Sequence, residues 1–150
     1  MAKLSSFRTV VTPKGAAKPV GPYSPAIRFG DLLFVAGQGP RDPKTGEIAR
    51  GVEAETRQVL DNLKTIVEGA GCRMADVLHT RVYLTDISDF AAMNAVYRAY
   101  FPADPPARTT VAVSALPEPG ARVEMDVVVG ARPGVRKRIA VSKKKKTRKR

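Results

Sequence analysis

Apolar residues between positions 52 and 70 recur every three or four residues, and this spacing constrains the fold more than any other feature. The repeating positions are Val59, Leu60, Leu63, Ile66, Val67 and Ala70, and the stretch GAG ends the run. A second segment, SDFAAMNAVYRAYFP, has the same spacing. It predicts a helix that begins with a Ser88 N-cap and ends near Pro102. We therefore expect two amphipathic helices.

The segments on either side of these helices show the patterns of β-strands. FRTVVTP is a candidate short first strand, and AIRFGDLLFVAGQ indicates a hairpin because Gly30 and Asp31 separate two apolar runs. VLHTRVYLTDI alternates, which predicts a strand with Leu78, Thr80, Val82 and Leu84 on one face. ARTTVAVSAL and ARVEMDVVVG, joined by the turn PEPG, are the last two strands.

The order strand, strand, helix, strand, helix, strand, strand predicts an α+β fold, in which one mixed sheet packs both helices on one face. Two helices leave the other face of such a sheet without cover from its own chain. We therefore expect further copies of the chain to cover it, which predicts a homo-oligomer.

The positive charge of the chain is concentrated at one end. The formal net charge is +12, yet residues 132–150 hold eleven Lys and Arg and no acid, and residues 1–131 hold 15 basic against 14 acidic side chains. The basicity therefore describes a tail, while residues 1–131 are expected to form one domain. The single cysteine, Cys72, and the lack of a signal-like apolar run favour a soluble cytoplasmic protein without membrane contact.

Three charged residues stand in strands that should be buried. Arg108 begins the strand of PARTTVAV, and Glu124 and Asp126 both point away from the apolar side of RVEMDVVV. One interpretation is that these carboxylates form salt bridges between subunits with Arg81 or Arg108. The other makes Arg108 a fork for a substrate carboxylate, with Glu124 as a general acid or base nearby. Spacing alone leaves both open.

The chain resembles the Rid family, also called the YjgF or L-PSP endoribonuclease family. The matching segments lie roughly between residues 17 and 130 and are GPYSPAI, LFVAGQGPRDPKTGEI, QVLDNLKTIVEGAG, DFAAMNAVYRAYF, PARTTVAVSALP and RVEMDVVV. The resemblance implies a chorismate-mutase-like fold assembled as a homotrimer with clefts between subunits. It also implies hydrolysis of 2-enamine and 2-imine acids to 2-keto acids and ammonia, with no cofactor and no metal.

The same resemblance assigns roles to six residues. Arg108 is the implied anchor of the substrate carboxylate, and Glu124 the acid that positions or deprotonates the attacking water. Tyr23, Asn94 and Gly37 are implied to line the cleft, Gly37 through its main chain. Thr110 is implied to hold the water through its main-chain carbonyl, which leaves its side chain free to vary.

Two positions depart from the family pattern, and one segment lies beyond it. Ala36 stands where many members have Ser, and Asp126 where Glu is usual, so the preferred imino acid is open. Residues 132–150 have too little apolar content to fold alone. Their charge suggests attachment to nucleic acid or the ribosome. A rival interpretation therefore stays open, in which the protein is an RNA-associated or chaperone-like regulator that acts through this tail.

Overall fold

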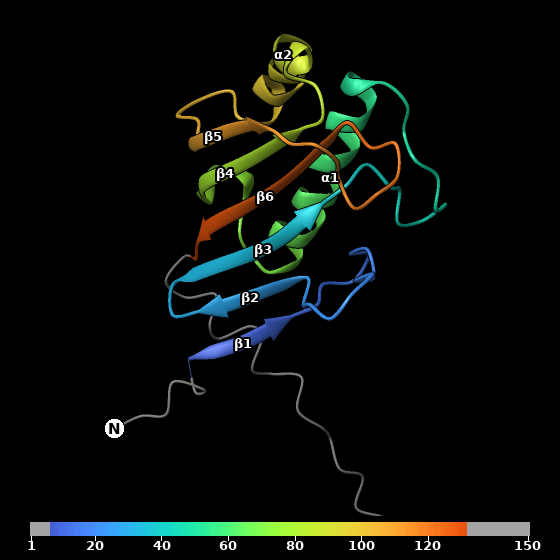
Figure 1. Cartoon of the computed structure of the whole chain (residues 1–150). Helices are drawn as coiled ribbons and strands as arrows, with labels where there is room; N and C mark the ends of the chain where they lie inside the picture. Colours follow the sequence, from blue (N-terminus) through green and yellow to red (C-terminus); the bar gives the residue numbers. More distant parts are fainter. Residues whose placement is uncertain (1–6, 132–150) are drawn as a thin grey trace, which may run out of the picture.

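The computed structural model describes residues 7–131, which form one six-stranded sheet in the order β1-β2-β3-β6-β4-β5 (Figure 1). The strands are β1 (Arg8–Val11), β2 (Ala26–Phe29), β3 (Leu32–Gln38), β4 (Val77–Leu84), β5 (Ala107–Ala112) and β6 (Val123–Gly130). The helices are α1 (Val52–Gly69) and α2 (Phe90–Tyr100), with the 3-10 turns η2 (Met74–Asp76) and η3 (Ile87–Asp89). Only β4 and β5 pair in parallel; the other neighbours are antiparallel.

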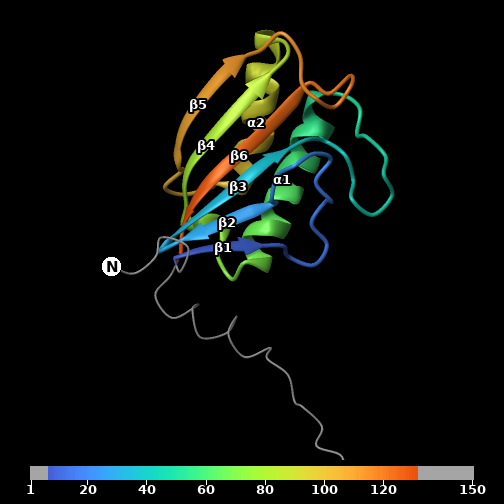
Figure 2. The same ribbon diagram turned by 60° about the horizontal axis from the view of Figure 1, so that its bottom comes forward.

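Both helices lie on the same side of this sheet (Figure 2), which confirms the predicted α+β arrangement. All six apolar positions predicted for the first helix are buried in the core. Side chains from one face of the strands meet them, among them Val82, Met125 and Val127. The apolar residues that alternate along the strands and those that recur every three or four residues in the helices therefore pack into the same core.

Two local expectations need correction. Leu78 is 51% exposed, because the pairing of β4 with β6 shifts register between Val77 and His79 and turns Val77 inward instead. Ser88 is not the cap of α2: Asp86 accepts hydrogen bonds from the Ser88 amide and hydroxyl and caps η3, so the helix begins at Phe90.

The last two strands are consecutive in sequence but are not neighbours in the sheet. β6 runs between β3 and β4, and β5 lies at the edge beyond β4 (Figure 1). The PEPG segment therefore belongs to a crossover between strands and does not close a hairpin. The basic segment 132–150 lies outside the described residues.

The face of the sheet away from the helices carries large apolar side chains. Val10, Phe29, Leu32, Phe34 and Val111 are each at least 37% exposed there. A patch of this kind is typical of a protein interface. That further copies of the chain cover this face stays a prediction.

Within residues 7–131, no helix has the length and apolarity needed to cross a membrane.

Candidate functional site

A pocket of about 620 Å³ opens where β3 and β6 lose their regular pairing. The register shifts between Val35 and Gln38, which indicates a bulge at Ala36 and Gly37. Tyr23, Gly37 and Glu124 all line this pocket, so the structure brings together three of the six predicted site residues.

The bulge lies against the Glu124 carboxylate. A Cβ atom placed on Gly37 would lie 2.3 Å from Glu124 Oε1, closer than any side chain allows. Gln38 is buried, and its side-chain amide donates to the carbonyl oxygens of Ala36 and Gly37, both at 3.1 Å. The absence of a side chain at position 37 therefore gives Glu124 its place in the pocket.

Glu124 is half-buried and has a carboxylate neighbour on the same face of its strand. Burial, followed by the charge of Asp126, raises the pKa of Glu124 above its usual value. Asp126 accepts hydrogen bonds from Arg81 Nε at 2.7 Å and from the Tyr83 hydroxyl at 3.1 Å. The salt bridge that one interpretation placed between subunits is thus formed by Asp126 and Arg81 of the same chain.

The far wall of the pocket is made by two loops. Arg41 pairs with Glu118 through Nε and Nη2, at 3.0 and 2.5 Å, and so joins the loop after β3 to the loop before β6. Asn62 of α1 donates to the carbonyl oxygens of Gly39 and Arg41 and so ties the loop after β3 to the helix. The pocket is therefore closed at this end by charged and amide groups.

Arg108 lies on the opposite face of the sheet. It pairs in register with Thr80, a fully buried residue whose hydroxyl accepts a hydrogen bond from Tyr97 of α2. The guanidinium carbon lies 4.7 Å from the centre of the Tyr97 ring and 5.6 Å from that of Phe90. Within residues 7–131 no carboxylate pairs with Arg108. Its fork of donors is thus held by aromatic rings and open to an anion.

The two remaining site residues lie on the same side as Arg108. Asn94 is half-buried on α2 at a spacing that places it between Phe90 and Tyr97. Thr110 follows Arg108 by two residues and faces the same way. Its hydroxyl oxygen is buried without a hydrogen-bond partner among the described residues. The role implied for its main-chain carbonyl stays a prediction.

One chain thus carries two half-sites separated by the sheet. The half-site that we call the pocket contains Tyr23, Gly37 and Glu124. The half-site that we call the anchor contains Arg108 with Asn94 and Thr110.

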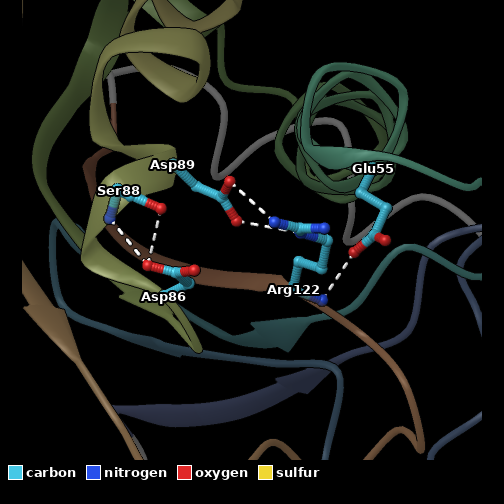
Figure 3. A network of polar contacts seen from close by, with 5 residues as sticks. All are labelled: Glu55, Asp86, Ser88, Asp89 and Arg122. Atoms are coloured by element: carbon cyan, nitrogen blue, oxygen red, sulfur yellow. Dashed lines mark hydrogen bonds and ion pairs between the residues drawn. The ribbon is translucent and has the colours of Figure 1, made fainter.

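The sequence reading missed a polar network at the beginning of β6 (Figure 3). Arg122 donates its backbone amide to Glu55 and its guanidinium to Asp89. Glu55 is only 3% exposed although it is charged. A signal was present: Glu55 occupies a core-facing position of the stripe along α1, where a carboxylate needs a buried partner.

The fold and the pocket define a class of small α+β proteins with a carboxylate at a bulged strand. Residues 14–131 match the family described as Endoribonuclease L-PSP. The chain belongs to this family, which is the Rid or YjgF family named above.

Three relatives illustrate the match. A RutC family protein of Pyrococcus horikoshii is 53% identical over 75% of this chain and 90% of its own. The 2-iminobutanoate/2-iminopropanoate deaminase of Escherichia coli K12 is 40% identical over 81% of this chain and 95% of its own. The crystal structure of E. coli TdcF with bound serine aligns with a TM-score of 0.79 at 33% identity, covering 83% of this chain and 99% of the other.

Proposed function

We propose that this protein is a hydrolytic deaminase of reactive 2-imine and 2-enamine acids, releasing 2-keto acids and ammonia in the cytoplasm. The observation that carries the proposal is Arg108, whose guanidinium stacks on two aromatic rings and has no carboxylate partner within residues 7–131. Such a group suits the carboxylate of an amino-acid-derived substrate. A deaminase 40% identical to the chain supports the assignment.

Glu124 supplies the second part of the proposed chemistry. The C2 carbon of a 2-imine acid is already electrophilic, so its hydrolysis needs a positioned water and a proton shuttle. As the water oxygen bonds to C2 of the protonated imine, ionised Glu124 takes a proton from the water and the C=N π electron pair moves to nitrogen, which gives a carbinolamine. Glu124 then returns this proton to the nitrogen, the C–N bond breaks to release ammonia, and the hydroxyl proton passes back to Glu124 as the C=O bond of the 2-keto acid forms. A carboxyl group with a raised pKa suits both steps, because it exchanges protons more readily near neutral pH.

Because the anchor and the pocket lie on opposite faces of the sheet, we propose that Arg108 of one copy meets Glu124 of another. The exposed apolar side chains on the open face support an assembly of copies. A homotrimer with three clefts is the arrangement that the family resemblance implies. In such a ring each copy contributes its anchor to one cleft and its pocket to the next.

A coupled assay tests the proposal. A threonine or serine dehydratase generates the imine, and release of 2-keto acid is followed with and without the protein. We expect faster release with the protein. If several amino-acid precursors gave no acceleration, the deaminase assignment would be wrong.

The pH at which the reaction becomes active should depend on the charge of Asp126. Because that charge raises the pKa of Glu124, Asp126→Asn should lower this pKa. If ionised Glu124 is the active form, kcat/KM rises with pH through its pKa, and the variant should begin this rise at lower pH. The measurement is the pH profile of kcat/KM. Glu53→Gln, an exposed carboxylate of α1, is the control and should leave the profile in place.

A methyl group at position 37 should move the Glu124 carboxylate. The Cβ atom of Gly37→Ala would collide with Oε1 at 2.3 Å. We expect kcat to fall by about 10-fold to 100-fold, the cost of a shift of about 1 Å in a catalytic group. Gly39→Ala is a matched control, since its Cβ would meet nothing closer than 3.9 Å. Equal activity of the two variants would contradict this placement of Glu124.

A second candidate function, attachment to nucleic acid, rests on the eleven basic residues of the segment 132–150. The described chain ends at Ala131, next to Asp31 at the β2–β3 turn. Glu124 lies near the other end of β6, about 20 Å away at roughly 3.3 Å per residue. The segment therefore joins the described chain at the end of β6 opposite to Glu124.

Removal of residues 132–150 should separate the two functions. We expect a chain ending at Ala131 to lose most of its affinity for a single-stranded RNA oligonucleotide and to keep its deaminase activity. The full chain should bind with a log-log salt slope of about −0.7 per phosphate contact. Unchanged RNA affinity after the deletion would refute this role of the segment.

A further inference from the structure

Arg122 is the point at which four elements of the chain meet. It directly precedes β6, and its backbone amide donates to Glu55 Oε2 in the first turn of α1 at 2.6 Å. Its carbonyl oxygen accepts from the Thr85 amide after β4 at 3.0 Å. Its guanidinium forms a two-pronged ion pair with Asp89, at 2.9 and 2.8 Å, just before α2 (Figure 3).

The partners of Arg122 are carboxylates that need it. Glu55 is 3% exposed and Asp89 is 7% exposed. A buried carboxylate is costly unless a donor satisfies it. Arg122 donates to both of them, one through the backbone and one through the side chain. Asp86 accepts hydrogen bonds from the amide and hydroxyl of Ser88 and so caps η3, the turn that ends at Asp89 (Figure 3).

Each arm of this junction leads to one half-site. The backbone arm holds the beginning of β6, where Glu124 lies two residues beyond Arg122. The side-chain arm holds Asp89, and the next residue, Phe90, is one of the two rings beneath Arg108. The two half-sites on opposite faces of the sheet are therefore connected through a single residue.

We propose that Arg122 is a positioning residue that fixes the positions of the pocket and the anchor relative to each other. The proposal rests on the deaminase function proposed above. It assigns different kinetic effects to the two arms. Weakening the ion pair between Arg122 and Asp89 displaces Phe90 beneath Arg108 and so weakens substrate binding. Loosening the Glu55 arm displaces Glu124 and slows the chemical step.

Three conservative variants test this division. Asp89→Asn keeps the shape of the side chain but removes its charge, and we expect KM to rise about 10-fold with kcat nearly unchanged. Glu55→Gln weakens the acceptor for the Arg122 amide, and kcat should fall about 10-fold with KM nearly unchanged. Arg122→Lys keeps the charge but loses the fork, and both parameters should change. The double variant Arg122→Lys/Asp89→Asn should have the KM of the worse single variant, because the two residues act as one unit.

Arg73→Lys is the matched control. Arg73 also donates through two nitrogens to a nearby carboxylate, Asp76, but this pair lies at η2, away from both half-sites. The control should keep the wild-type kcat and KM. The proposal is overturned if Arg122→Lys behaves like this control, or if Asp89→Asn and Glu55→Gln change kcat and KM in the same proportion.

Hydrogen exchange gives a readout that does not depend on catalysis. In Arg122→Lys the amides of Val123–Met125 and of residues 90–93 should both exchange faster, whereas Arg73→Lys should leave them unchanged. If the wild-type protein fails to hydrolyse imines but shows this paired exchange, the proposed function is wrong and the junction stands. If exchange changes at only one of the two segments, the junction proposal fails whatever the activity.

Discussion

Arg108→Ala is expected to remove imine hydrolysis while the protein stays folded. Loss of one partner of a desolvated, hydrogen-bonded charge pair costs about 2 to 5 kcal/mol. With about 1.4 kcal/mol for each factor of ten, we expect kcat/KM to fall about 30-fold to 4,000-fold. The measurement is the coupled dehydratase assay together with a thermal unfolding curve.

The fold should tolerate this change for a structural reason. Arg108 lies on the edge strand β5 and contacts two rings, a contact that contributes about 0.5 to 1 kcal/mol. Arg73→Ala serves as the control for removal of an arginine outside both half-sites. Turnover near the wild-type value in Arg108→Ala would take this residue out of the site.

Glu124→Gln should lower kcat about 100-fold to 10,000-fold, with little change in KM. The amide has nearly the same shape but cannot accept the proton of the attacking water. The folded chain already disfavours the ionised carboxylate, because it raises the pKa of Glu124. The variant should therefore be at least as stable as the wild type at pH 7, where the unfolded chain carries the charge.

Mixing the two inactive variants tests whether the site lies between copies. In a mixed assembly of Arg108→Ala and Glu124→Gln chains, the intact anchor of the second variant can face the intact pocket of the first. Co-expression should therefore restore part of the activity that each variant lacks alone. If the mixture stayed as inactive as its components, two copies would not share a site, and the proposed assembly would be wrong.

Much of the fold followed from local pattern. The stripe from Val59 to Ala70 and the alternation in β6 both report which side of an element faces the core, and such periodicity depends only on backbone geometry. The uncovered sheet face followed as well, because two helices that pack on the same face leave the other face open. The errors at Leu78 and Ser88 came from a register shift and from the competing cap at Asp86. Both depend on neighbours that periodicity does not report.

The sequence by itself determined the α+β class, the helices, the core stripe and the segments that carry the family resemblance. Only the tertiary structure decided that β6 lies between β3 and β4, that Asp126 pairs with Arg81 of its own chain, and that Arg108 and Glu124 face opposite sides. The junction at Arg122 belongs to the second group. Its partners are 67 and 33 residues away in sequence. The stripe of α1 shows that Glu55 needs a buried partner, but contacts at such separations arise only when the whole chain packs, so no local spacing identifies Arg122 as that partner.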